Sequence, residues 1–198
     1  YRAFGVNFYS AFMRHLRDAE DTSFREGFKE LGALNIPFLR FAACGYMPSD
    51  MKLCIEKKEE YFARMDAVVK SAEENGVGLV PSFFWYTACI PDLAGEPRNQ
   101  WGNPDSKTIA LMRQYTRDVV SRYVNSPAIW IWEFGNEFDL AVDLPNAADH
   151  RPGVNVGLGT LASRSDADDL RFDMMGVAFR EFAKTVRGGL RDSDVFGR

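Results

Sequence analysis

The stretch Ala128–Phe138 reads Ala-Ile-Trp-Ile-Trp-Glu-Phe-Gly-Asn-Glu-Phe, and it decides the fold. It begins with an apolar run, bounded by Pro127 and Gly135, that is too short and too aromatic for a helix of its own. Such a run predicts a buried β-strand. Asn136 and Glu137 follow at the point where this strand ends. Side chains at the carboxyl ends of parallel strands can converge on a ligand, so these two are the first candidate site residues.

An amide beside a carboxyl group suits sugar chemistry. The amide of Asn136 can hold a hydroxyl group, while the carboxyl group of Glu137 can give its proton to a leaving glycosidic oxygen. The alternative for Glu137 is a solvated loop carboxylate without a catalytic role.

Four strands and four helices alternate along the chain. Strands are expected at residues 3–8, 36–42, 77–85 and from 128 onward, and helices at 23–32, 56–75, 104–124 and 165–190. The first helix is expected to start with a capping box, Ser23 with Glu26. Residues 14–21 are expected to form a loop. Each later helix carries apolar residues at helical spacing that must face a sheet.

Strict alternation of strand and helix predicts an α/β fold with a parallel sheet, either doubly wound or a barrel. The long loops follow strands and the short turns follow helices, which favours a (β/α)8 TIM barrel. A whole barrel needs about 250 residues. The 198 residues of this chain therefore predict one domain, 1–198, that is the N-terminal half of a barrel and stops where a fifth strand is expected.

Composition excludes several classes of partner. The net charge is −4 and the charged residues are interspersed, so the sequence does not predict a nucleic-acid-binding surface. No apolar run approaches the roughly 18 residues of a membrane span. Residues 1–20 lack the pattern of a signal peptide, although the chain does not begin with Met.

Cysteine and histidine usage does not predict a metal site or a cofactor. Cys44, Cys54 and Cys89 lack metal-ligand spacing, and we expect buried thiols, with Cys44 and Cys54 as the one pair to check for a bridge. His15 and His150 are the only histidines, which are too few for a histidine-rich metal site.

The segment Trp132–Glu137 resembles the end of the fourth strand in clan A glycoside hydrolases, particularly the family five cellulases and β-mannanases. The resemblance implies that Asn136 binds the sugar 2-hydroxyl group and that Glu137 is the general acid/base. It also implies a nucleophilic glutamate at the end of a seventh strand, which this sequence does not contain.

Two residues of the earlier strands extend this resemblance. Arg40 lies in an apolar strand and must be paired if it is buried. The resemblance implies that Arg40 supports the nucleophilic carboxylate, whereas a strand-end arginine reaching solvent is the alternative. Asn7 ends the first strand in a segment that resembles the start of the family, but a structural turn would also explain it.

Trp85 ends the third strand, where its indole face could stack on a sugar ring. Many cellulases have a histidine near this point, so Trp85 looks more like the mannanase branch. Trp101 is a second possible sugar platform, with loop packing as the alternative. Trp130 and Trp132 are expected in the core. Glu133 is expected to face the same side as Glu137 and to pair with Arg40 or with the catalytic group, with an outward-facing residue as the alternative.

The segment Gly157–Ala162 fits a glycine-rich dinucleotide pattern, but a polar, proline-containing stretch precedes it instead of a strand. We therefore expect a loop there.

These observations lead to one hypothesis and two alternatives. The hypothesis is a retaining glycoside hydrolase for β-linked mannan or glucan chains, with Glu137 as acid/base, no cofactor and a carbohydrate as its partner. By resemblance we expect it to be secreted or periplasmic. The alternatives are a non-catalytic carbohydrate-binding relative and a barrel isomerase or lyase that uses Glu137 as a base.

Overall fold

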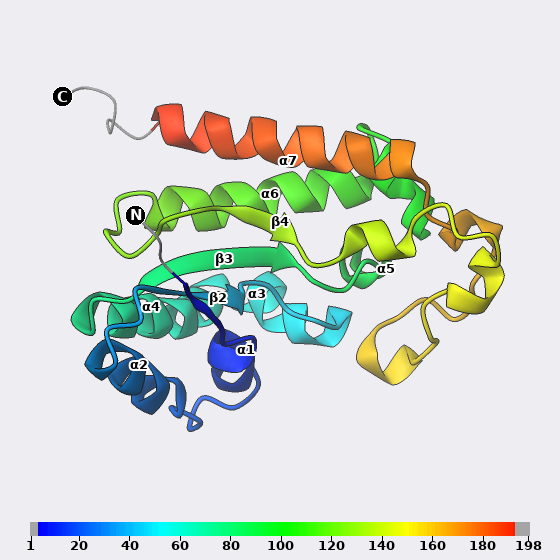
Figure 1. The fold of residues 1–198 in the computed structure, drawn as a ribbon. Coiled ribbons are helices and arrows are strands. Elements are labelled where there is room, and N and C mark those ends of the chain that lie inside the picture. The colour runs from blue at the N-terminus through cyan, green and yellow to red at the C-terminus, as the bar shows by residue number, and fades with distance from the viewer. Residues whose placement is uncertain (1–3, 193–198) are drawn as a thin grey trace. The chain divides into compact units, whose positions relative to one another are not determined.

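The computed structural model describes residues 4–192, and of the last two it describes only the backbone. Four parallel strands form one sheet in the order β1-β2-β3-β4. Their bounds are Val6–Asn7, Phe38–Ala42, Gly78–Phe84 and Glu133–Gly135 (Figure 1). The α-helices are α1 Ser10–Arg17, α2 Phe24–Ala33, α3 Lys52–Glu56, α4 Lys58–Glu74, α5 Cys89–Ala94, α6 Lys107–Tyr123 and α7 Phe172–Asp192.

The chain divides into two compact units. Unit 1 comprises residues 1–46, 50–83 and 125–133, and unit 2 comprises residues 47–49, 84–124 and 134–198. The division falls inside the strands β3 and β4. The expectation of a single domain over residues 1–198 stays a prediction.

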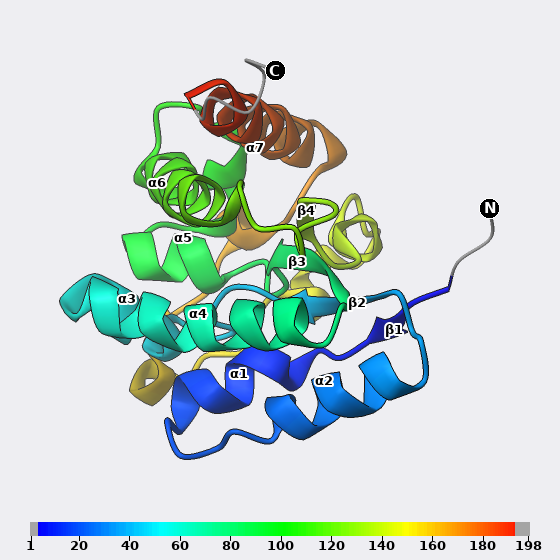
Figure 2. The ribbon, with the colours of Figure 1, turned by 90° about the vertical axis from the view of Figure 1, so that its left-hand side faces the viewer.

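Unit 1 holds the start of the sheet and the helices α1, α2 and α4. The β1–β2 and β2–β3 pairs are parallel, with Asn7 opposite Arg40 and Ala42 opposite Ser82. All seven residues of β3 are buried, which is typical of a parallel strand covered on both faces. Helices α1 and α2 lie side by side (Figure 2). Helix α4 buries the predicted apolar stripe, Phe62, Met65, Val69 and Ala72.

Unit 2 has an aromatic core with rings from the ends of β3 and β4 and from α7, and its helices α6 and α7 run alongside each other (Figures 1 and 2). The rings of Phe84, Phe134 and Phe182 are in mutual contact, with centroids 5.3–6.3 Å apart. Helix α6 begins where the Ser106 hydroxyl accepts the Ile109 N–H, which satisfies one free donor of the first turn.

Several local predictions for the first helices and the loop after β3 are wrong. Residues 10–17 form α1, because Phe12, Met13 and Leu16 share a buried face despite the polar residues between them. Ser23 makes no cap bond, since its hydroxyl donates to Asp21. The long loop predicted between the third strand and the helix at 104–124 contains α5 and a 3-10 helix, Arg98–Gly102.

The segment before α7 also differs from the prediction. The last helix begins at Phe172, and Ser165 instead caps a 3-10 turn, Asp166–Asp168, in a capping box with Asp168. Residues 157–162 form no strand-to-helix turn, so the expected loop is confirmed.

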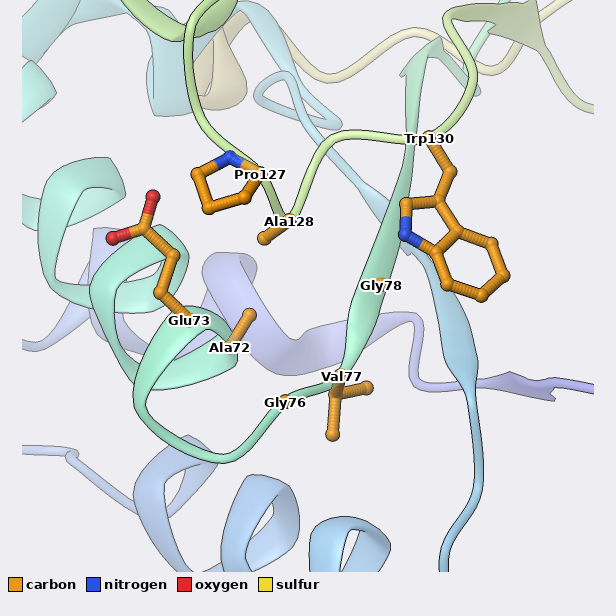
Figure 3. Close-up of a pocket in the computed structure, with 8 residues that line it drawn as sticks. All are labelled: Ala72, Glu73, Gly76, Val77, Gly78, Pro127, Ala128 and Trp130. Atoms are coloured by element: carbon orange, nitrogen blue, oxygen red, sulfur yellow. The ribbon is translucent and has the colours of Figure 1, made fainter.

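The fourth strand is shorter than predicted and is interrupted. Ile129 forms a bridge with Leu79, but the regular strand is only Glu133–Gly135. Trp130 is 51% exposed, so its expected place in the core is wrong. It borders a shallow pocket of about 150 Å³, and its indole covers Gly78, where a Cβ atom would lie 2.3 Å from the ring (Figure 3). Trp132 is half-buried against Phe83.

The glycine that ends β4 is expected to be irreplaceable. A Cβ atom on Gly135 would lie 2.2 Å from the carbonyl oxygen of Phe84 and 2.5 Å from the Phe138 ring. Because backbone cannot move aside cheaply, Gly135→Ala should lower the free energy of unfolding by about 1–3 kcal/mol in urea titrations. The control is Gly188→Ala in α7, where nothing lies within 4 Å. It should raise stability by about 0.5–1 kcal/mol. Equal effects of the two changes would contradict this account.

Candidate active site

Arg40 is the centre of a polar cluster that draws on all four strands. Its Nε donates to Glu133 Oε2 over 2.5 Å. Its Nη2 lies 3.3 Å from the Ser82 hydroxyl and its Nη1 lies 3.4 Å from Asn7 Oδ1. The guanidinium group is largely enclosed, with 19% of the side chain exposed, so its charge needs these partners.

The cluster shows how the strand register creates the site. Asn7 and Arg40 are register partners, and Ser82 lies two residues beyond Val80, the partner of Arg40 on β3. Side chains two residues apart on a strand share a face, so Arg40 can reach across to Ser82. The expected pairing of Arg40 with Glu133 is observed, whereas the sequence analysis did not single out Ser82. A serine in an apolar strand was the signal that could have found it.

Asn136 and Glu137 follow β4 immediately, as predicted, and they belong to unit 2. Asn136 is half-buried and Glu137 is exposed. The backbone of Glu137 is left-handed, with φ 51° and ψ 34°, a conformation that costs a residue with a Cβ atom about 1–2 kcal/mol. The Phe138–Ala141 turn that follows is closed by the Leu140 N–H donating to the Glu137 carbonyl. Strain of this kind is concentrated at functional sites.

The two tryptophans considered as sugar platforms, Trp85 and Trp101, differ in their burial. Trp85 follows β3 and is half-buried, and its role as a sugar platform stays a prediction. Trp101 is fully buried, donates its indole N–H to the Thr87 carbonyl over 2.8 Å and packs on Phe134. Trp101 is therefore a packing residue. Because Arg40 and Glu137 belong to different units, their convergence on one cavity stays a prediction.

Unit 2 also contains a buried charge cluster that the sequence analysis missed. Arg164 forms a two-pronged ion pair with Asp92, at 2.5 and 2.7 Å, and its side chain also reaches Asp168 at 3.4 Å. Arg98 donates to the carbonyl oxygen of Asp168 over 2.7 Å. The hydrogen bonds to Asp92 raise the pKa of Arg164, whereas burial lowers the pKa of Arg98 against the opposing effect of Asp168. Both guanidinium groups remain cationic at neutral pH.

Metal and disulfide chemistry find no support in the described part of the chain. Residues 4–192 contain no cluster of three or more His, Cys, Asp or Glu side chains that could hold a metal ion. Cys44, Cys54 and Cys89 form no disulfide, so Cys44 and Cys54 are not bridged. Cys44 and Cys89 are buried, as expected, whereas Cys54 is only half-buried. Among the described helices, none combines the length and the apolar character needed to cross a membrane.

Comparison with known proteins tests the resemblance directly. No family model matches the chain. The sequence is 38% identical over 82 residues to a probable mannan endo-1,4-β-mannosidase F of Emericella nidulans, covering 37% of this chain and 18% of that protein. It is 33% identical over 99 residues to a probable mannan endo-1,4-β-mannosidase A-1 of Aspergillus terreus, covering 46% of this chain and 25% of that protein.

Solved structures match nearly the whole chain. The GH5_18 protein of Streptomyces cattleya, solved in complex with GlcNAc, covers 94% of this chain with a TM-score of 0.65 and 16% identity. The resemblance to family five glycoside hydrolases is confirmed. The exo-β-1,4-mannosidase Op5Man5 of an Opitutaceae bacterium covers 96% of the chain, with a TM-score of 0.62 and 15% identity. The chain spans 42% and 31% of these two proteins, so its α/β fold is that of part of a family five barrel.

The Arg40–Glu133 pair is expected to couple the strands β2 and β4 energetically. Because the pair is partly exposed, a double-mutant cycle with Arg40→Met and Glu133→Gln should give a coupling energy of about 1 kcal/mol in urea unfolding. The control is the same cycle on Lys70 and Glu74 of α4, which are 3.8 Å apart and mostly exposed. It should give less than about 0.5 kcal/mol. Similar coupling in the two cycles would show that Arg40 does not tie the strands together.

Proposed function

We propose that this chain is part of a retaining glycoside hydrolase that cleaves β-linked mannan or related chains, with Glu137 as the general acid/base. The observation that carries the proposal is the placement of Asn136 and Glu137 directly after the fourth parallel strand, with Glu137 in a strained left-handed backbone. The identity to proteins named mannan endo-1,4-β-mannosidases supports a mannan-type substrate.

The chemistry proceeds in two steps. In the first, Glu137 gives its proton to the glycosidic oxygen while a second carboxylate attacks the sugar carbon, so that the glycosidic bond breaks and a glycosyl ester forms. In the second, Glu137 takes a proton from water as the water displaces the ester. The family resemblance implies that the second carboxylate is a glutamate outside this sequence.

Residues of this chain would hold the sugar during both steps. The half-buried Asn136 supplies an amide for a sugar hydroxyl group, and Trp85 supplies an indole face. Arg40 is fixed by Asn7, Ser82 and Glu133. A cation held in this way can lower the pKa of a carboxyl group nearby and keep it ionised, as a nucleophile requires.

Endo- and exo-acting enzymes both occur among the similar proteins. The curated relatives are named endo-mannosidases and Op5Man5 is named an exo-mannosidase. Release of long fragments from mannan would indicate endo action, and release of single sugars would indicate exo action. The location of the whole protein, expected outside the cytoplasm, stays a prediction.

The decisive change is Glu137→Gln in the full-length protein, assayed on mannan, glucan and aryl glycosides. Loss of the acid should lower kcat/KM on mannan by about 10²–10⁴-fold. Asp139→Asn, an exposed carboxylate two residues away, should leave kcat/KM unchanged. Unchanged hydrolysis in the Glu137 variant would remove it from the mechanism. Binding of mannan without cleavage by the unmodified protein would favour the non-catalytic alternative.

A further inference from the structure

The loop that begins after Glu137 is unusually long and well ordered by its own contacts. It runs over residues 138–171 between β4 and α7 and contains only short 3-10 turns. Loops of this length inside compact domains are uncommon and are mostly functional. Its two ends are joined by a bridge between Val142 and Leu170 and by the Asp143 N–H, which donates to the Leu170 carbonyl.

Four buried charged residues fasten this loop to the segment after β3. We call Asp92, Arg98, Arg164 and Asp168 the clamp. Asp92 lies on α5 and Arg98 on the next 3-10 helix, whereas Arg164 and Asp168 lie in the loop. Besides its bonds to Asp168, Arg98 donates to the Thr87 hydroxyl over 3.0 Å. The clamp therefore joins two loops that both follow strands and whose sequence positions are about 70 residues apart.

The clamp is sealed from water. Only 6% of the Arg164 side chain is exposed, with 2% for Asp168 and 0% for Asp92. Replacing a buried ion pair by well-packed apolar side chains is often neutral or stabilising, whereas removing one partner is strongly destabilising. The stability of the folded chain therefore does not by itself require charged residues at the position of the clamp. Their directed hydrogen bonds do fix the position of the loop with respect to α5 and the 3-10 helix.

A short chain of contacts leads from the clamp to Glu137. Arg98 and Trp101 share the 3-10 helix, and Thr87 bonds both the Arg98 side chain and, through its carbonyl, the Trp101 indole. The ring of Trp101 packs edge-on against Phe134, 5.8 Å away, and Phe134 packs on Phe138 at 5.0 Å. Phe134 and Phe138 flank the segment that carries Glu137.

We propose that the clamp is a positioning device that holds Glu137 in the orientation needed for proton transfer to a leaving sugar. The inference rests on the proposed function. A precisely positioned acid matters for substrates with poor leaving groups, namely the glycosidic oxygens of oligo- and polysaccharides. We therefore infer that these are the substrates of the site, because only such leaving groups need a proton as the bond breaks. None of the four clamp residues is proposed to touch the substrate.

The test is Arg164→Lys in the full-length protein. Lysine keeps the charge, so the buried balance of charges survives, but it cannot form the two-pronged pair with Asp92. We expect kcat/KM on manno-oligosaccharides to fall by about 10–100-fold, the effect of a slightly misplaced catalytic group. On a 2,4-dinitrophenyl β-mannoside, whose leaving group needs no proton, kcat/KM should stay within about twofold. A merely structural role would lower both values by the same factor, which would overturn the proposal.

The matched control is Arg151→Lys. Arg151 forms a similar two-pronged pair with Asp169 on the same loop, but about a quarter of each side chain is exposed. This variant should behave as the unmodified protein on both substrates. A selective loss of oligosaccharide hydrolysis in Arg151→Lys as large as in Arg164→Lys would contradict a specific role for the clamp.

A second measurement is independent of activity. The Leu140 N–H reports on the turn after Glu137, because it donates to the Glu137 carbonyl. Its hydrogen exchange should become about tenfold faster in Arg164→Lys, through easier local opening, and should not change in Arg151→Lys. Unchanged exchange in Arg164→Lys would overturn the clamp proposal. Faster exchange in a protein without glycosidase activity would support the positioning and refute only the proposed function.

Discussion

The hydrogen bonds of the Arg40 guanidinium group are the interactions that hold the four strands together at the polar cluster. It takes partners from β1, β3 and β4 while its own strand pairs with two of them. A cation in a mostly apolar strand is costly unless it is paired, so Asn7, Ser82 and Glu133 are constrained by a charge that lies among them. The Arg40 side chain thus bonds to Glu133, a residue 93 positions away in the sequence.

The two units enclose charge differently. The Arg40 cluster is partly open, with about a third of the Glu133 side chain exposed, whereas the clamp excludes solvent almost completely. The partly exposed cation of Arg40 can still act on a ligand, because its charge is not completely neutralised by its fixed partners. A sealed one can act only through the backbone that it holds. This contrast is why we propose Arg40 as a site residue and the clamp as the support of Glu137.

Much of the fold could be predicted from the sequence, because the apolar patterns are strong. The strand 78–84 and the stripes of α4 and α6 are where the spacing of apolar residues puts them. Alternation along β4 also indicated that Glu133 could reach Arg40. Helix α1 was not predicted because Arg14 and His15, of which His15 is buried, interrupt the apolar pattern of its buried face. The clamp could not be predicted, since Asp92 and Arg164 meet only through the tertiary fold. The position of Glu137 relative to Arg40 likewise could not be predicted from the spacing of apolar residues within single strands and helices.

The position of the tryptophans has a practical consequence for spectroscopy. Trp130, in unit 1, is half exposed to solvent, whereas Trp101, in unit 2, is fully buried and contacts the rings of Phe84 and Phe134. Indole emission shifts to the red in water, so the two side chains should fluoresce at distinct wavelengths, and iodide should quench Trp130 first. A chain in which both Trp85 and Trp101 are replaced by phenylalanine would keep tryptophans only in unit 1, namely Trp130 and Trp132, and would report the melting of unit 1 alone. Coincidence of that signal with the far-ultraviolet dichroism would mean that the two units unfold as one cooperative body.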